Sequence, residues 1–417
     1  MGTHRKKKKY KVKSRFVFFV ILCIVIFVGA FILVPKMLNS DNKTDTEEKK
    51  AVSVFANKTD LTIMCSGDNM VHQPQLEAGK TGDGYSFNAC YDYVKKPIEK
   101  ADLALCNMEV TFPGSRYTGY PAFRTPDALA DAVKYAGFDV AITSNNHMVD
   151  SGADGLKRTK KVLEKVGLPV VGSRQNHEEK NYLVKDVKGV KVGIISYTYA
   201  DSVSEDKVLI NGNPLSGDDM ELANFFTKST VDQDLKKIEK SVSGAEKDGA
   251  EIVVVYYHWG TEYQTIPSEL QEKVAKATAK MNVDMIFASH PHVLQRADII
   301  KVKDDQGKVD KKVPIYYSLG NFISNQNRVT LNDVNTEIGA LGVVKCTYNP
   351  KTDRLENINM DPIPTWVNKY YSGKTKYRIV PLEGNYTENE SVVAANGASK
   401  AKEARKIAYD ILELDPK

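Results

Sequence analysis

The chain has 417 residues, which allows one large domain or two ordinary ones with a sizeable buried core. Its 58 Lys and Arg residues against 53 Asp and Glu residues give a net charge of +5 at pH 7. The basic excess gathers in residues 1–15, so the rest of the chain is close to neutral, which argues against a nucleic-acid partner.

The N-terminal segment has the pattern of a membrane anchor. A basic tail over residues 1–15 precedes an uncharged apolar run over residues 16–34, which as a helix would span about 28 Å. The exit Val34-Pro35-Lys36-Met37 is a poor signal-peptidase site, so we expect an uncleaved transmembrane helix. The positive-inside rule then predicts a single-pass protein of the cell membrane with a cytoplasmic N-terminus and an extracellular main domain. Residues 35–58 are polar and predict a flexible stalk.

Short apolar runs after the stalk predict strands that are buried on both faces. They cover residues 61–65, 102–106, 139–143, 191–196, 251–257, 284–288 and 313–318. Helical patterns cover residues 127–136, 152–166, 231–247 and 268–281. This alternation predicts an α/β sandwich within one domain over residues 59–375. Residues 376–417 read as a C-terminal extension that ends in a helix over residues 398–414.

Polar motifs stand at or near the ends of these strands, where open α/β sheets bind their ligands. They are Gly67-Asp68-Asn69, Asn107-Met108-Glu109, Ser144-Asn145-Asn146-His147, His258-Trp259-Gly260-Thr261-Glu262 and Ser289-His290-Pro291-His292. Carboxylate, amide and imidazole groups together suit manganese, iron or zinc, and a two-metal hydrolytic site needs one bridging carboxylate. The expected metal ligands are Asp68, Glu109 as the bridge, Asn146, His258, His290 and His292.

Taken together, these motifs resemble the CapA family, the bacterial capsule synthesis proteins linked to poly-γ-glutamate, whose fold is similar to that of the calcineurin-like metallophosphoesterases. The resemblance also takes in residues 145–152 and 317–322, and it covers residues 61–322. It implies an α/β fold, a four-layer αββα sandwich of metallophosphatase type. It further implies one or two divalent metal ions, and His147 as a catalytic acid that faces a phosphate.

The same resemblance implies a function in capsule or poly-γ-glutamate biosynthesis or export, with metal-dependent hydrolysis as one reading of the site. The expected partners are an anionic polymer or phosphoester substrate, the membrane, and other membrane proteins of capsule assembly. Two alternatives stay open. One is a non-catalytic subunit that binds or assembles polymer, and the other is a secreted metallophosphoesterase unrelated to capsule.

One departure from the phosphoesterase pattern leaves the number of metals open. The first motif of those enzymes is Asp-x-His, whereas this chain has Asp68-Asn69-Met70, so one metal loses an imidazole. His72 follows four residues after Asp68. It is either a replacement ligand or a surface residue.

Other residues also admit two readings. Asn107 either orients the Glu two residues later or closes a turn, and Glu262 is expected to support a ligand rather than to be one. Trp259 either stacks on substrate or packs in the core. Cys65 and Cys106 stand late in two strands and are either partners in a disulfide or buried free thiols.

Overall fold

The computed structural model describes residues 57–413. Residues 59–349 and 353–413 belong to one compact unit. The predicted basic tail, the predicted transmembrane helix at residues 16–34 and nearly all of the predicted stalk lie outside the described residues. Among residues 57–413, no helix is long and apolar enough to cross a bilayer.

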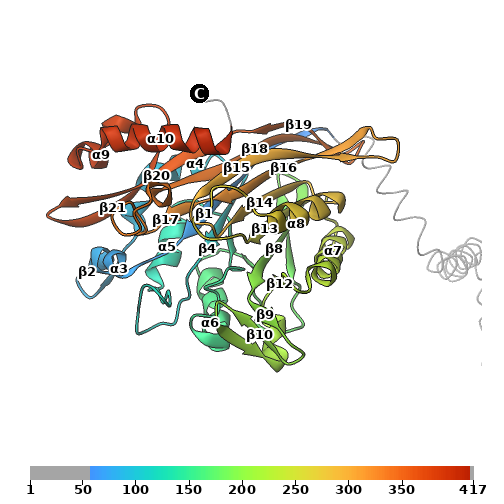
Figure 1. Ribbon diagram of the computed structural model, residues 1–417, viewed down its shortest axis with the longest axis horizontal. Helices are drawn as coiled ribbons and strands as arrows, with labels where there is room; N and C mark the ends of the chain where they lie inside the picture. Colours follow the sequence, from blue (N-terminus) through green and yellow to red (C-terminus); the bar gives the residue numbers. More distant parts are fainter. Residues whose placement is uncertain (1–56, 414–417) are drawn as a thin grey trace, which may run out of the picture. The chain divides into compact units, whose positions relative to one another are not determined.

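Two large β-sheets dominate the unit (Figure 1). The first sheet contains β1 (Thr59–Asn69), β4 (Leu103–Met108), β5 (Val140–Ile142), β6 (Val170–Val171), β17 (Asn321–Ile323), β18 (Ile338–Asn349), β19 (Arg354–Met360), β20 (Ile363–Ser372) and β21 (Lys374–Pro381). Its order is β21-β20-β18-β1-β4-β5-β6, with β17 beside β1 and β19 beside β18. β1 runs parallel to β4 and antiparallel to β18, so a strand from late in the chain lies beside the first strand.

The second sheet contains β7 (Tyr182–Val187), β8 (Val190–Ala200), β12 (Phe225–Thr227), β13 (Ile252–His258), β14 (Met285–Ser289), β15 (Leu294–Lys303) and β16 (Val309–Leu319). Its order is β12-β8-β13-β14-β16-β15, with β7 beside β8. The strands β8, β13, β14 and β16 run parallel to one another, whereas β7 and β15 pair antiparallel with β8 and β16. The helices α7 and α8 provide the crossovers that enter β13 and β14.

Smaller elements complete the unit. The short strands are β2 (Lys80–Thr81), β3 (Gly84–Tyr85), β9 (Ser202–Val203), β10 (Lys207–Ile210) and β11 (Asn213–Ser216). The α-helices are α3 (Gln73–Gly79), α4 (Asp92–Ile98), α5 (Ala128–Tyr135), α6 (Gly152–Lys165), α7 (Val231–Lys247), α8 (Glu269–Lys280), α9 (Glu390–Ala394) and α10 (Ala398–Leu412). The 3₁₀ turns are η1 (Asn88–Cys90), η2 (Gly217–Leu222), η3 (Val334–Glu337) and η4 (Tyr386–Glu388).

The two-residue period of each strand divides the core into layers. Ile63 and Leu105 of the first sheet pack together with Val254 of the second sheet in the core between the sheets. The alternate residues Met64 and Ala104 instead join the helices α4 and α5 on the outer face. On the second sheet, the outer face packs against α7 and α8 (Figure 1). The structure therefore has helices, two facing sheets and helices in succession, and the expected mixed α/β class is confirmed.

The C-terminal segment is part of the same unit. The boundary expected between residues 375 and 376 falls inside β21, which pairs with β20 over its whole length. The predicted terminal helix corresponds to α10, which packs against β20 and β15. Its Ala404 and Leu412 are buried in the same core as the inner face of β1.

The pleat also decides between the two readings of the cysteines. Ser66 is the residue opposite Cys106, whereas Cys65 is opposite Leu105. Cys65 therefore faces the core between the sheets, and Cys106 faces the helices. The described cysteines are free, as the thiol reading predicts.

Candidate metal centre

The six predicted ligands lie at the carboxyl ends of strands from both sheets. Asp68 stands near the end of β1, Glu109 follows β4, and Asn146 lies in the loop after β5. His258 ends β13, and the residue opposite it in β14 is Ser289, directly before His290. All six side chains are buried. We refer to Asp68, Glu109, Asn146, His258, His290 and His292 as the ligand cluster.

Distances between side-chain atoms show that the ligand cluster is contiguous. His292 Nδ1 lies 3.1 Å from Asp68 Oδ2, and His292 Nε2 lies 3.8 Å from Glu109 Oε1. His258 Nε2 lies 3.6 Å from the same glutamate oxygen and 2.9 Å from Asn146 Oδ1. The structure therefore brings together residues separated by more than two hundred positions in the chain.

Two groups within the ligand cluster could each hold a cation, and they share one carboxylate. Ligand atoms of Glu109, His258 and His290 lie within 4.8 Å of one another, and so do those of Asp68, Glu109 and His292. Because Glu109 belongs to both groups, it occupies the position that the sequence assigned to a bridging ligand. This arrangement suits two adjacent cations as well as one.

Buried atoms without hydrogen-bond partners provide a test of whether a cation fits. Both carboxylate oxygens of Glu109 lack a partner, and so do Nδ1 of His258 and Nδ1 of His290. Such atoms are rare in folded proteins, because losing water without a replacement partner costs about 1–3 kcal/mol for each group. Carboxylate oxygens and imidazole nitrogens are ligand types for manganese, iron and zinc. The residues present therefore fit a divalent transition metal.

The protonation states follow from burial and from neighbouring charges. Burial and the nearby Asp68 carboxylate raise the pKa of Glu109 well above its usual value. Burial also lowers the pKa of His258 to about 3 and that of His290 well below its usual value, so both rings are neutral at pH 7. Neutral imidazole is the form that coordinates metals.

Asp68 is held in the ionised form. Burial alone would raise its pKa, but the hydrogen bond from His292 and the electrostatic interaction with His292 outweigh burial and lower it. Asn107 contributes as well, because its amide Nδ2 donates to Asp68 Oδ1 over 2.8 Å. Asn145 in turn donates to Asn107 Oδ1 over 3.1 Å. Asn107 thus orients Asp68, not Glu109 as one reading of the sequence had it.

The backbone at the ligand cluster is unusual in two places. His290 has φ 109° and His292 has φ 56°, a region that side-chain-bearing residues rarely adopt. The turn is fixed from outside, because Trp259 N–H donates to the carbonyl of Ser289 over 3.0 Å and Tyr263 N–H donates to that of Pro291 over 2.7 Å. These two hydrogen bonds hold both imidazoles beside the carboxylates of the first sheet.

A close contact between two glycines positions Asp68. A Cβ atom on Gly67 would lie 2.0 Å from the carbonyl oxygen of Gly320, so no larger residue fits there. The same carbonyl accepts the Asp68 N–H over 2.9 Å. This explains why the motif around Gly320 accompanies the motif around Asp68 in the sequence.

His147, the predicted acid, lies outside both cation groups. Its Nδ1 is 2.8 Å from Asp150 Oδ2, and the same oxygen accepts the Phe123 N–H over 2.6 Å. Phe123 also packs edge-on against the His147 ring, with centroids 4.6 Å apart. The role of Asp150 was missed in the sequence, although its spacing of three residues from His147 was the available signal.

Three further residues were singled out in the sequence, and the structure gives each of them different surroundings. Trp259 is buried between Tyr257 and Tyr317 and donates from its indole to the Tyr317 carbonyl, so it packs in the core and does not reach substrate. The half-exposed carboxylate of Glu262 lies 4.0 Å from His292 Nε2, and with His290 and His292 it forms a further group that could hold a metal, so it can be a ligand and not only a support. His72 is half-buried against Gln75 and, within residues 57–413, belongs to no group that could hold a metal.

Comparison with known proteins gives a consistent result. Residues 62–326 match the family described as Bacterial capsule synthesis protein PGA_cap. A capsule biosynthesis protein CapA from Bacillus anthracis is 37% identical over 203 residues, which are 48% of this chain and 44% of that protein. A PGA biosynthesis protein CapA from Bacillus subtilis is 25% identical over 337 residues, which are 79% of this chain and 77% of that protein. The chain thus spans less than half of the first relative and about three quarters of the second.

Solved structures with a resemblance include two bacterial proteins. A novel phosphatase from Mycoplasma pneumoniae has a TM-score of 0.42 at 15% identity, over 74% of this chain and 95% of that one. The calcineurin-like phosphoesterase YfkN from Bacillus subtilis has a TM-score of 0.40 at 14% identity, over 83% of this chain and 98% of that one.

Proposed function

The chain belongs to the bacterial capsule synthesis protein family PGA_cap, and we propose that it acts in the synthesis or export of poly-γ-glutamate as a metal-dependent hydrolase. The relative from Bacillus subtilis is named a PGA biosynthesis protein, which supports this polymer as the substrate. In this proposal, the anchor predicted at residues 16–34 holds the catalytic domain at the outer face of the cell membrane, beside other proteins of capsule assembly.

The observation that carries the proposal is the set of buried, unpartnered ligand atoms in the ligand cluster. Glu109, His258 and His290 would hold one divalent cation, and Asp68, Glu109 and His292 would hold a second or share the first. Such a cation would supply Lewis-acid stabilisation for charge on a phosphate or carbonyl oxygen of the substrate. The metallophosphatase-type fold expected from the sequence is consistent with this chemistry.

His147 is the proton donor in the proposal. Asp150 accepts a hydrogen bond from Nδ1, which fixes the ring and leaves Nε2 without a hydrogen bond among the described residues. In its protonated form, His147 can pass a proton from Nε2 to the leaving group of the substrate. The buried carboxylate of Asp150 holds the ring in place.

The test uses the full-length protein, purified in detergent. Metal content is measured by mass spectrometry, and hydrolysis of poly-γ-glutamate and of a generic phosphodiester is followed with and without chelator. We expect bound transition metal and chelator-sensitive hydrolysis in the wild type, and neither in His258→Ala. A wild-type protein without metal, together with normal polymer yield from cells carrying His290→Ala, would remove the proposal.

A non-catalytic role in binding or assembling the polymer is the second candidate, and Met70 favours it. Met70 stands where the phosphoesterase pattern Asp-x-His has its histidine, and its side chain is buried in the apolar core on the outer face of the first sheet. One imidazole of the phosphoesterase pattern is therefore absent from this position. Polymer yield that depends on His290, without any hydrolysis by the purified protein, would select this candidate.

A further inference from the structure

A second pocket lies away from the ligand cluster, between α3, η1 and the edge strand β21. Its volume is about 260 Å³. Apolar side chains form much of its wall: Val71, Ala78, Phe87, Tyr91, Leu129 and Ile323. No member of the ligand cluster lines it, so it is a separate site.

Cations dominate the charge of this pocket. Lys374, Lys376 and Arg378 line it, and no Asp or Glu does. Within residues 57–413, these three cations form no ion pair. Lys374 Nζ donates to the Lys80 carbonyl over 3.3 Å, Lys376 Nζ to Ser372 Oγ over 3.5 Å, and Arg378 to the Tyr377 carbonyl over 2.9 Å. Three unpaired cations beside an acid-free pocket favour an anionic ligand.

The spacing of the cations indicates the shape of that ligand. They occupy alternate positions of β21, so they are about 6.6 Å apart along the strand. Three cations in a row match a polymer that carries an anionic group at regular intervals. They match a single compact anion less well. The cavity is large enough for at least one glutamyl side chain, whose methylene groups suit the apolar wall.

We propose that this pocket binds one carboxylate-bearing residue of an anionic polymer, with neighbouring carboxylates of the same polymer along Lys374, Lys376 and Arg378. The identity of the polymer rests on the proposed function. No member of the ligand cluster lines the pocket, so binding there requires neither metal nor hydrolysis.

The experiment measures binding of a γ-linked glutamate oligomer of about ten residues to the full-length protein by calorimetry at low salt. The variant Lys374→Ala/Lys376→Ala/Arg378→Ala should raise the dissociation constant at least tenfold. The control Lys236→Ala/Lys240→Ala/Lys247→Ala removes the same charge from exposed positions of α7 and should change it less than twofold. Equal effects of the two triple variants would overturn the proposal.

A second variant tests the cavity without changing any charge. Ala89 lines the pocket, so Ala89→Trp should fill it and weaken oligomer binding at least fivefold even if the triple variant folds poorly. Unchanged binding to Ala89→Trp would overturn the proposal. Binding of octanoate in place of the oligomer, lost in Ala89→Trp, would show that the occupant is an acyl chain and would overturn it as well.

The metal-centre variant His258→Ala separates this inference from the proposed function. Oligomer binding to His258→Ala should equal that of the wild type, because His258 does not line the pocket. Loss of binding in His258→Ala would place the polymer at the ligand cluster and overturn the second site. If the wild-type protein holds no metal but still binds the oligomer, the result would support polymer binding at the pocket and contradict the proposed metal-dependent hydrolysis.

Discussion

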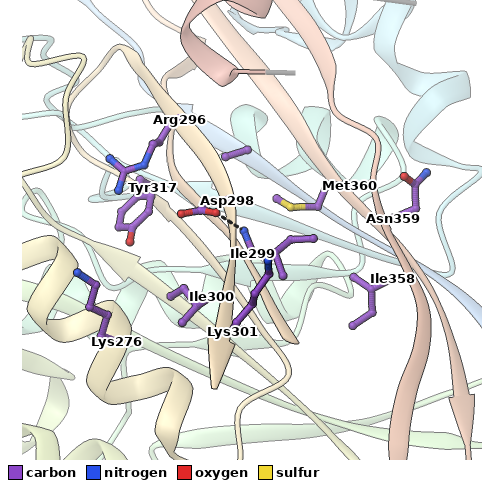
Figure 2. Close-up of a pocket in the computed structure, with 11 residues that line it drawn as sticks. Lys276, Arg296, Asp298, Ile299, Ile300, Lys301, Tyr317, Ile358, Asn359 and Met360 are labelled. Atoms are coloured by element: carbon purple, nitrogen blue, oxygen red, sulfur yellow. Dashed lines mark hydrogen bonds between the residues drawn. The ribbon is translucent and has the colours of Figure 1, made fainter. Parts of the chain in front are cut away.

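The ligand cluster and the groove between β15 and β19 are both rich in charged side chains, but only one of them leaves its polar atoms unsatisfied. The groove, shown in Figure 2, has a volume of about 860 Å³. Glu272 accepts from Arg296 over 2.9 Å and from Lys276 over 3.0 Å, and Asp298 accepts the N–H of Ile299 over 2.6 Å. The Arg296 guanidinium also lies 4.7 Å from the centre of the Tyr317 ring.

The ligand cluster shows the opposite pattern. Both oxygens of Glu109 and a ring nitrogen of each of two histidines are buried there without a partner. Arg296 and Lys276 of the groove have partners within the protein, whereas these buried ligand atoms have none among the described residues. Unsatisfied buried atoms therefore mark the ligand cluster, and not the groove, as the place where a bound cation is expected.

The largest expected effect comes from the carboxylate shared by both cation groups. Glu109→Gln keeps the shape of the side chain but removes its charge, so metal affinity should fall about a hundredfold or more. Metal content after dialysis and a titration with Mn²⁺ or Zn²⁺ measure it. Glu272→Gln removes the partner of two cations that line the groove and is the matched control. It should keep the wild-type metal content. Full metal content in Glu109→Gln would show that the ligand cluster does not need this carboxylate to bind metal.

Asp150→Ala should lower the free energy of unfolding by about 3 kcal/mol. The carboxylate accepts one hydrogen bond from His147 and one from the Phe123 N–H, and hydrogen bonds to a charged group are worth about 1.5–3 kcal/mol each. Urea denaturation at pH 7 measures the loss. Asp150→Asn retains an acceptor oxygen and should lose less. An equal loss in both variants would show that the charge is what matters.

His72 should make stability depend on pH. Burial lowers its pKa to about 4, whereas an unfolded histidine has a pKa near 6.5. Between these values the unfolded chain binds more protons, so stability is complete above about pH 6.5 and falls as the pH drops towards 4. The slope from this residue is at most about 1.4 kcal/mol per pH unit. Denaturation midpoints of the wild type and of His72→Gln from pH 4 to 7 should diverge with that sign, and parallel curves would contradict the assignment.

The smallest effect is expected at Glu272, which pairs with two cations that line the groove. Glu272→Gln breaks two partly exposed ion pairs, and such pairs typically contribute about 0.5 kcal/mol each. The free energy of unfolding should therefore change by about 1 kcal/mol or less, with no change in metal content. A larger loss in the free energy of unfolding would mean that the ion pairs of Glu272 contribute more to stability than partly exposed pairs usually do.

The sequence was most informative where a buried strand ends in a polar motif. Asp68, His258 and His290 follow apolar runs that can only be strands, and parallel strands bring their carboxyl ends to one edge of a sheet. The structure brings these residues together, although whether they bind metal stays a prediction. The helices at α6 and α7 were equally accessible, because their apolar residues repeat with the period of a helix.

Other features lay outside the reach of sequence patterns. The choice of Asp68 as the partner of Asn107 depends on how two side chains meet across neighbouring strands, which no spacing in the chain encodes. The orientation of Cys65 away from Cys106 follows from the pairing of β1 with β4, in which Cys65 is opposite Leu105, and from the pleat. The place of β18 beside β1 depends on pairing across nearly three hundred residues. Periodicity is local, so it identifies elements but not their neighbours.

The position of β18 also sets the order of events during biosynthesis. β1 carries Asp68 and lies between β4 and β18, but β18 is made only after residue 349 leaves the ribosome. The first sheet cannot close around a partly synthesised chain, and His290 and His292 likewise arrive late. Assembly of the ligand cluster must therefore wait for these late segments, so under the proposed function the ions present where folding ends, and not those at the translating ribosome, would decide which cation the cluster binds.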